Sequence, residues 1–340
     1  MRDSARRGAA FEAWHRHRAS LAHSRLRARR RIATAALLAA ALFGGYARAR
    51  AADEASLRVA DQKGLVHALL DASHALDGAP YHIDWSEFEN AAPLLQAINA
   101  DAVDTGIAGD GPFLFAFGAG QDVRATQAVL PRAGGRAVAI VVPSGSPIRT
   151  LADLAGRRIA TTRGSIGHEL LLALEQDGRL RSPGPLVTLS PAQAAAALRA
   201  GSVAAWSTWE PYVALTEAQG GHRIADGTGV LANYAFQVSN HRAIAEKHAL
   251  LQDFYHRLAL AYAWGNDHPD QYAAIWSRQV GMPLALSVQV ADEMRTHAAP
   301  IGDDIIAAEQ KALDSYRVAG ILPPGAARPL SEAFDRSFTP

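Results

Sequence analysis

The chain of 340 residues has no cysteine and only three lysines, which are Lys63, Lys247 and Lys311. The absence of cysteine excludes disulfide bonds, a cysteine nucleophile and a lipid anchor on an N-terminal cysteine. A long apolar run is also missing, because the uncharged stretch 32–46 is shorter than the roughly 20 apolar residues that span a bilayer. The sequence therefore predicts neither a disulfide-stabilised scaffold nor a transmembrane anchor.

The segment 1–51 has the organisation of a secretory signal peptide. Residues 1–31 contain ten arginines and two acidic residues, the apolar run 32–46 follows, and the segment 47–51 (ARARA) offers small residues for cleavage. A basic region, an apolar region and a small-residue exit, in this order, are typical of exported proteins. We therefore expect a periplasmic protein. The pair Arg29-Arg30 leaves both the general secretory and the twin-arginine route open, and the long basic region leaves open a later translation start.

Loss of this segment changes the charge balance of the protein. Residues 1–51 hold twelve of the 34 Lys+Arg and two of the 33 Asp+Glu, so 22 basic and 31 acidic residues remain. The formal net charge falls from +1 to −9. Nucleic-acid binding depends on the neutralisation of phosphates by basic side chains. A mature protein this acidic, without a basic run, is not expected to bind nucleic acid.

Short apolar strand-like runs followed by helical patterns recur along the mature chain. A first series covers residues 57–130, and a second begins with the unbroken apolar run 137–142, which is typical of a buried strand. Such alternation indicates parallel strands that are covered by helices. From His241 to the end the pattern is almost entirely helical. The sequence therefore predicts an α/β protein with parallel-dominated sheets and a helical C-terminal tail.

The two series predict two lobes that are joined by crossing strands. We expect lobe one to contain residues 52–136 together with 237–340, and lobe two to contain residues 137–236. The length of the mature chain is sufficient for two lobes of ordinary domain size. Ligands of such sheets bind beyond the carboxyl ends of the strands, so the strand-to-helix turns are the positions of interest.

Three of these turns have residues suited to anion binding. They are Glu89-Asn90-Ala91, Gly109-Asp110-Gly111-Pro112 and the segment from Arg163 to His168, which reads RGSIGH. Asn90 and Ser165 are good helix N-caps, and glycine lets the backbone approach a ligand closely. Several converging helix N-termini bind an anion without Lys or Arg, through unpaired N–H groups and the positive ends of the helix dipoles. Taken singly, each of these turns is better interpreted as an ordinary turn of an α/β protein, so the anion site needs further support.

Side chains added at two of the glycines are expected to affect binding more than folding. We expect a bulky residue at Gly111 or Gly164 to occupy the space of the bound anion.

An aromatic stretch begins within a further predicted strand, 204–208, and continues toward a predicted helix, 210–219. Residues 205–212 read AWSTWEPY, and Pro211 suits the first turn of a helix. Trp206 and Trp209 are either both core residues, or at least one of them lines the cleft as an apolar wall for the carbon part of a ligand. The residues alone leave both interpretations open.

With these residues the chain resembles the alkanesulfonate, taurine and nitrate binding proteins of ABC importers. Five segments that stand in order carry the resemblance: RVADQKG at 58–64, WSEFENAAPLLQAINADAVDTGIAGDGPFLFA at 85–116, VPSGSPIRTLADLAGRRIATTRGSIGHELLLALE at 142–175, AQAAAALRAGSVAAWSTWEPY at 192–212 and NYAFQVSNHRAIAEKH at 233–248. A looser helical continuation reaches about Tyr316. The motifs are more specific for the family than for one ligand.

The resemblance implies a two-lobed periplasmic binding protein of type II that closes on a small oxyanion. An aliphatic or related organic sulfonate is the expected ligand, with nitrate, taurine or another organic anion as the alternative. The implied partners are an ABC permease and its ATPase, the protein is expected to be a monomer, and neither a cofactor nor a metal is implied. By position, the ligand-binding residues are Gln62, Asn90, Ala91, Gly109, Asp110, Gly111, Gly164, Ser165, His168, Trp206, Trp209 and Glu210.

The chain departs from the family at two of these turns. Ala108 stands where many sulfonate binders have a hydroxyl residue before Gly-Asp, and Asn90 stands where small residues are commoner. Both departures bear on the identity of the ligand. A carboxylate beside an anion would repel it, so we expect Asp110 to bond to the backbone or to a neighbouring cation.

An enzyme on the same fold is the alternative class. The fold is also that of a desulfinase and a thiamine-precursor synthase that resemble this family. The cysteine nucleophile expected in the desulfinase is absent, and neither a G-x-S-x-G elbow nor an H-E-x-x-H motif occurs. His168 alone is a candidate for a ligand contact, a base or a donor at a helix end. The other nine histidines of the mature chain are scattered without ligand spacing.

The signal-peptide prediction has a direct test. We expect mature protein from the periplasm to begin at or near Arg50 or Ala52, as N-terminal sequencing would show. Soluble, active protein that retains Met1 would refute the prediction.

Overall fold

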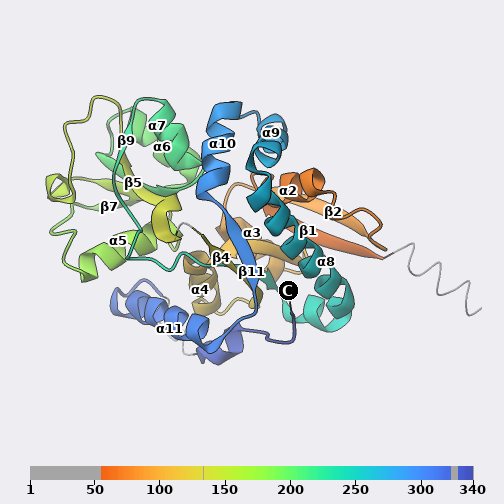
Figure 1. Ribbon diagram of the computed structural model, residues 1–340. Coiled ribbons are helices and arrows are strands. Elements are labelled where there is room, and N and C mark those ends of the chain that lie inside the picture. Colours follow the sequence, from red (N-terminus) through yellow and green to blue (C-terminus); the bar gives the residue numbers. More distant parts are fainter. Residues whose placement is uncertain (1–54, 133, 323–327, 340) are drawn as a thin grey trace, which may run out of the picture. The chain divides into compact units, whose positions relative to one another are not determined.

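The computed structural model describes residues 55–132, 134–322 and 328–339. The predicted signal peptide and its cleavage site lie outside the described residues. Figure 1 shows the elements from β1 to α11 in the colours of the sequence.

Six strands form the first sheet. In spatial order they are β11 (Thr296–Ala299), β4 (Arg124–Pro131), β10 (Ala235–Ser239), β3 (Thr105–Gly109), β1 (Ser56–Gln62) and β2 (His82–Phe88). Five strands form the second sheet. In spatial order they are β7 (Leu186–Thr188), β6 (Ile159–Thr161), β8 (Ala205–Trp209), β5 (Val138–Val142) and β9 (His222–Asp226). The chain passes from the first sheet to the second between β4 and β5, and it returns between β9 and β10.

Helices cover both sheets, with α5, α6 and α7 around the five-stranded sheet and α3 and α4 beside the six-stranded one (Figure 1). Their bounds are α2 (Leu65–Ser73), α3 (Ala91–Asn99), α4 (Asp110–Gly118), α5 (Ile166–Gln176), α6 (Pro191–Arg199), α7 (Tyr212–Ala218), α8 (His241–Asp267), α9 (Pro269–Val280), α10 (Leu284–Glu293) and α11 (Asp303–Val318). Short 3₁₀ turns are η1 (Gly134–Ala137), η2 (Leu151–Leu154) and η3 (Leu330–Ala333). None of the described helices combines the length and the apolar character needed to cross a lipid bilayer.

The α/β class with two helix-flanked sheets is confirmed, whereas the strand pairing is mixed rather than mainly parallel. Strand β1 pairs with β2 and β3 in parallel, and β6 pairs in parallel with β7 and β8. Strand β10 is antiparallel to both β3 and β4, and β5 is antiparallel to both β8 and β9. The antiparallel pairs arise where the chain crosses between the sheets and re-enters a sheet in the opposite direction.

Strand β11 corrects the prediction of an almost entirely helical tail. Residues Thr296–Ala299 pair antiparallel with β4 at the edge of the six-stranded sheet. The segment is only four residues long, so an alternating pattern had no length in which to appear.

The predicted buried strand at the start of the second series is confirmed. All five residues of β5 are buried, and they alternate between two apolar clusters. Ile140 packs with Leu170 and Leu174 of α5, and Val141 packs with Leu198 of α6 and Trp206 of β8. A strand that is covered on both faces has no polar side, which explains the unbroken apolar run.

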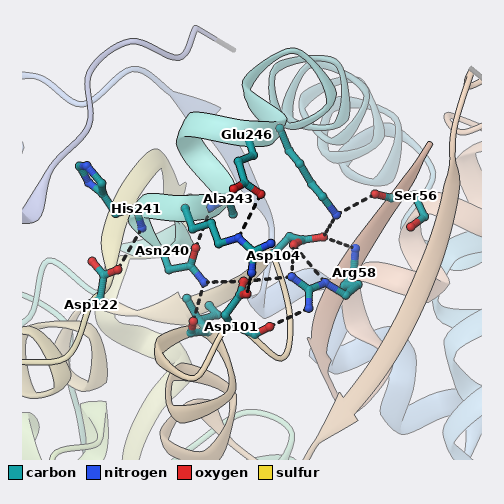
Figure 2. A network of polar contacts seen from close by, with 12 residues as sticks. Ser56, Arg58, Asp101, Asp104, Asp122, Asn240, His241, Ala243 and Glu246 are labelled. Atoms are coloured by element: carbon teal, nitrogen blue, oxygen red, sulfur yellow. Dashed lines mark hydrogen bonds and ion pairs between the residues drawn. The ribbon is translucent and has the colours of Figure 1, made fainter. Parts of the chain in front are cut away.

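A polar network at the amino ends of β1 and β3 fastens α8 to the six-stranded sheet (Figure 2). The carboxylate of Asp104 is 1% exposed, and it accepts hydrogen bonds from the Arg58 backbone N–H at 2.7 Å and from Lys247 Nζ at 2.7 Å. Lys247 also donates to the carbonyl of Ser56 at 3.0 Å. Burial acts to raise the pKa of Asp104, but the hydrogen bonds from Arg58 and Lys247 outweigh it and hold the pKa below its usual value.

This network predicts a loss of stability on neutralisation of one carboxylate. Replacement of Asp104 by Asn leaves Arg58 and Lys247 without their buried counter-charge, and we expect it to lower the free energy of unfolding by about 3 kcal/mol. Because the pKa of Asp104 is lower in the folded state, its contribution is present above the unfolded pKa and is lost as the pH falls through the folded pKa. Urea denaturation at neutral and at acidic pH measures both effects.

The matched control is Asp101→Asn in the same network. The Asp101 side chain is 29% exposed, so its ion pairs are screened by solvent and we expect a loss below about 1 kcal/mol. Asn also tolerates the positive φ of 56° at this position. Equal losses in the two variants would contradict the assignment of Asp104 as the centre of the network.

Candidate functional site

A cavity of about 230 Å³ lies between residues of the two sheets. Gln62 and Gly109, at the carboxyl ends of β1 and β3, contribute to its wall from the six-stranded sheet. Trp209, at the carboxyl end of β8, contributes from the five-stranded sheet. The Gln62 side chain donates from Nε2 to the carbonyl of Ile107 at 2.7 Å, which fixes its orientation beside β3. The cavity therefore lies where ligands of α/β sheets are expected to bind.

The start of α3 presents two free donors to this cavity. Asn90 is the N-cap, is 8% exposed and accepts from the Ala92 N–H through Oδ1 at 3.0 Å. Asn90 Nδ2 and the N–H of Ala91 have no acceptor among the described residues, and both residues line the cavity. The N-cap role that the sequence predicted for Asn90 is confirmed.

The start of α5 presents a similar pair of donors. Ser165 is the N-cap and accepts from the His168 N–H through Oγ at 3.2 Å, which leaves its hydroxyl hydrogen free. Within the part of the chain that the structure describes, the N–H of Ile166 has no acceptor. Both Ser165 and Ile166 line the cavity. The starts of α3 and α5, which lie beside different sheets, thus offer four unpaired donors to the same cavity.

His168 lies behind this turn and does not line the cavity. The side chain is 4% exposed, and Nδ1 accepts from the Gly164 N–H at 3.1 Å, so the ring proton is on Nε2. Burial, together with the positive charge of Arg163, lowers the pKa of His168, and the ring is therefore neutral. The structure corrects the expected ligand contact: His168 orients the turn that begins α5.

The start of α4 departs from the expected arrangement of the cradle. Gly109 lines the cavity, but Asp110 and Gly111 do not. The carboxylate of Asp110 is 2% exposed and accepts from the N–H groups of Gly111 at 2.7 Å and Tyr234 at 2.9 Å. This is the backbone bonding that the sequence predicted for Asp110. It also occupies the Gly111 N–H, which is therefore not available to an anion.

The expected role of Gly111 and Gly164 as open space for an anion is wrong. A Cβ on Gly111 would lie 2.7 Å from Glu169 Oε2 and 2.7 Å from the hydroxyl of Tyr316. A Cβ on Gly164, whose φ is +69°, would lie 2.6 Å from the ring of Phe115. Both glycines allow close packing between helices, because α4 and α11 meet the start of α5 here. Gly164 also lines the cavity, so it serves both contacts.

The two tryptophans of the aromatic stretch have different environments. Trp209 lines the cavity and its ring meets Tyr212 edge-on at 5.7 Å. Trp206 is 1% exposed and packs in the core beside Val141, so its expected place in the cleft is corrected. Strand β8 includes both residues, and residues three apart on a strand point to opposite faces. The sequence did not resolve this because it placed the end of the strand before Trp209.

Glu210 lines the cavity, but its carboxylate is turned toward other side chains. Oε2 accepts from the Ala214 N–H at 3.1 Å, and Oε1 lies 3.7 Å from Arg223 Nη2. Burial raises the pKa of Glu210 to about 8, which the nearby Arg223 only partly offsets. The Glu210–Pro211 peptide bond is cis. Glu210 is therefore a structural residue of this wall.

Sequence reasoning missed the part of the wall that comes from the helical tail. Tyr262 of α8, Tyr272 of α9 and Met294 line the cavity together with Leu65 and Leu69 of α2. No local motif distinguishes these residues from ordinary core positions of amphipathic helices. Three basic side chains also line the cavity, namely Lys63, Arg163 and Arg295. Arg163 donates to the carbonyl of Ile321. Arg295 pairs with Asp292 through Nη2, whereas its Nε is buried without a hydrogen-bond partner among the described residues.

The site has the chemistry of a binding pocket for an anion with an apolar part. Unpaired N–H groups at helix starts attract negative charge, and the aromatic and aliphatic wall accommodates carbon. In the described ranges no group of three or more His, Asp or Glu side chains is arranged to hold a metal ion.

Comparisons with known proteins agree with this geometry. The model of the NMT1/THI5-like family matches residues 83–272. A protein of Escherichia coli K12 that is named for aliphatic sulfonate binding is 32% identical over 300 residues, which cover 86% of this chain and 92% of the relative. The alkanesulfonate-binding protein SsuA from Xanthomonas axonopodis pv. citri, solved bound to MOPS, is similar with a TM-score of 0.76 and 32% identity over 83% of this chain and 99% of that chain.

A desulfurization enzyme, DSZB, shares the fold alone. Its TM-score is 0.59 at 20% identity, over 84% of this chain and 97% of that chain.

Because a Cβ on Gly164 would clash with the ring of Phe115, we expect an alanine at this position to destabilise the protein strongly. Gly164→Ala adds both a positive-φ strain and a clash with the ring, and we expect it to lower the free energy of unfolding by about 3 kcal/mol. The matched control is Gly178→Ala, with a φ of +66° and open space around the added Cβ, for which about 1 kcal/mol is expected. Thermal denaturation of both variants gives the comparison. Equal costs, or no rescue of Gly164→Ala by Phe115→Ala, would show that the contact is unimportant.

Proposed function

The chain belongs to the NMT1/THI5-like family, and on this basis we propose that it is the solute-binding component of an ABC importer for organic sulfonates. The ligand that we propose is an aliphatic or related sulfonate, bound in the cavity between the two sheets. Taurine, nitrate or another organic anion is the alternative ligand for the same site. The protein binds and releases its ligand and is not an enzyme.

The observation that carries the proposal is the convergence of helix starts on one cavity. Among the residues that the structure describes, the N–H groups of Ala91 and Ile166 and the side-chain donors of Asn90 and Ser165 have no acceptor. A sulfonate spreads one negative charge over three oxygens, so it is matched by several distributed donors at the positive ends of helices.

The apolar part of the wall favours a sulfonate with a carbon chain over a bare inorganic anion. Leu65, Leu69 and Tyr272 line the cavity from the side of the six-stranded sheet, and Trp209 lines it from the other side. Apolar side chains of this kind remove the alkyl part of a ligand from water, at about 25 cal/mol per Å² of buried apolar surface. Nitrate has no part that would use this wall.

The division into lobes belongs to the same proposal. We assign residues 52–136 with 237–340 to lobe one and residues 137–236 to lobe two, and strand membership supports the division. Strands β1–β4 and β11 of the six-stranded sheet lie within the ranges of lobe one, and β10 (Ala235–Ser239) begins two residues before the boundary at residue 237. All strands of the five-stranded sheet, β5–β9, lie within 137–236. Relative motion of the two lobes would then open and close the cavity.

The cellular location and the partners that we propose rest on the similarity to known binding proteins. We propose a periplasmic location with an ABC permease and ATPase as partners, which the similarity to periplasmic sulfonate-binding proteins supports. Cleavage of residues 1–51 and a monomeric state stay predictions.

The enzyme alternative lacks a reacting group. The chain has no cysteine, and the candidate base His168 is buried, neutral and bonded through Nδ1 to a backbone N–H. The similarity to the desulfurization enzyme concerns the fold, which hosts several functions. A binding protein therefore accounts for the site better than a hydrolytic enzyme.

Thermal denaturation of the mature protein with a panel of ligands tests the proposal. We expect alkanesulfonates and MOPS to raise the melting temperature in proportion to occupancy, and nitrate and simple carboxylates to raise it less. Ser165→Ala removes one donor to the headgroup and one helix cap, and we expect a loss of about 1–2 kcal/mol in sulfonate binding.

The matched control is Ser190→Ala. Ser190 caps α6 with the same bond, to the Gln193 N–H at 3.4 Å, but it does not line the cavity. This variant should lose stability and keep its sulfonate affinity. A panel without any sulfonate response would refute the proposed ligand, and release of sulfite from a bound sulfonate would favour the enzyme.

A further inference from the structure

Three carboxyl groups are buried together where helices of the two sheets meet. Asp110 of α4 is 2% exposed, Glu169 of α5 is 8% exposed and Glu309 of α11 is 1% exposed. The hydroxyl of Tyr316 on α11 donates to Glu169 Oε2 at 3.0 Å, and this bond links α11 directly to α5. Helix α4 follows β3 of the six-stranded sheet, and α11 packs on α4. Helix α5 packs on β5 and β8, so Glu169 is the carboxyl group on the side of the five-stranded sheet.

The three carboxyl groups lack positive partners. Among the described residues, no Lys, Arg or His forms an ion pair with Asp110, Glu169 or Glu309, and no metal arrangement includes them. Glu309 Oε2 is buried without any hydrogen-bond partner. Three charged carboxylates in one dry contact would repel each other, and the cost of burying each charge would be large.

The groups that face the cluster come from every helix packed around it. Helix α4 contributes Asp110, α5 contributes Glu169, and the segment before β10 contributes Tyr234, while α11 contributes Glu309, Tyr316 and, further toward its start, Asp304. Burial raises the pKa of Asp110 to about 7. Burial, and then the charge of Asp110, raise the pKa of both Glu169 and Glu309 well above the usual range. Near neutral pH the cluster therefore holds protons.

The position of the cluster connects it to the anion site. Asp110 is the first residue of α4, and Glu169 lies in the first turn of α5. A Cβ on Gly111 would lie 3.3 Å from the backbone nitrogen of Ile166 and 2.7 Å from Glu169 Oε2. The carboxyl cluster therefore lies next to the Ile166 N–H, which is one of the donors of the cavity. An ionised carboxylate here neutralises the positive helix end that a bound anion uses, and it also repels the anion.

We propose that Asp110, Glu169 and Glu309 form a protonation-controlled latch, which holds the two lobes together through Tyr316 when neutral and releases them when ionised. The latch rests on the proposed function, since it regulates closure around the same ligand. In the neutral state the Tyr316–Glu169 bond joins α11 to α5, and no negative charge opposes an anion at the start of α5. Ionisation strengthens the hydrogen bond from Tyr316 to Glu169. In the ionised state the mutual repulsion of the buried carboxylates outweighs this bond, separates α5 from α11 and weakens anion binding.

The direction of the pH effect follows from proton linkage. The closed form raises the pKa of these acids relative to an open, hydrated form, so it holds more protons than the open form. Its advantage is complete at low pH and is lost as the pH rises toward the raised pKa values. Closure on a sulfonate therefore takes up protons, and the Kd rises about tenfold per pH unit for each proton taken up.

Titration calorimetry with 1-butanesulfonate between about pH 6 and about pH 9 tests this linkage. The sulfonate stays ionised throughout this range, so a change in Kd reports on the protein. We expect the Kd of the wild type to rise with pH and that of Glu169→Gln to change at least threefold less over the same range. Gln keeps an acceptor for Tyr316 but carries no charge at any pH. Glu309→Gln serves as a second variant, and Asp314→Asn, an exposed residue of α11, is the control that should follow the wild type.

Small-angle X-ray scattering of the ligand-free protein tests the latch without a ligand. We expect the radius of gyration of the wild type and of Asp314→Asn to increase between the two pH values, with circular dichroism unchanged. Glu169→Gln should show a smaller increase. The same pH response in all variants, or none in the wild type, would overturn the latch. Absence of 1-butanesulfonate binding at every pH would instead count against the proposed function, while the scattering comparison still decides on the latch.

Discussion

The structure depends on helix N-termini as a source of positive charge. Without residues 1–51 the chain has 22 basic and 31 acidic residues, and two of the three basic side chains that line the cavity, Arg163 and Arg295, interact with other residues of the protein. Each helix start contributes roughly half an elementary charge and several unpaired N–H groups, and these need no counter-charge elsewhere in the fold. One start comes from the six-stranded sheet, at Asn90, and another comes from the five-stranded sheet, at Ser165. In the proposed site neither sheet alone supplies all the donors, so the proposal couples ligand binding to the relative position of the two sheets.

Two buried aspartates at opposite ends of strand β3 differ in their electrostatic state. Asp104 lies at the amino ends of the strands, where Arg58 and Lys247 hold it in the charged form. Asp110 lies at the carboxyl end of β3, where burial without a cation favours its neutral form. The first arrangement stabilises the fold at a fixed place. In the proposed site, the second arrangement keeps negative charge away from the helix starts to which we assign the anion.

Much of the fold and part of the site could be predicted from the sequence. Three features depend on local chemistry and could be predicted from neighbouring residues: the apolar run at 137–142, the caps Asn90 and Ser165, and the bond from the Gly111 N–H to Asp110. The antiparallel edge strand β11 and the inward face of Trp206 depend on pairing and on the exact end of a strand, which local patterns do not contain. The close approach of Gly111 to Glu169 and Tyr316 depends on three segments that are far apart in the chain.

A crystal structure of the mature protein with a bound alkanesulfonate tests the central claim most directly. The account predicts that the sulfonate oxygens accept hydrogen bonds from the N–H groups of Ala91 and Ile166 and from the side chains of Asn90 and Ser165. The alkyl chain should then lie against Trp209. A headgroup held by Lys63, Arg163 or Arg295, away from the helix starts, would contradict the account.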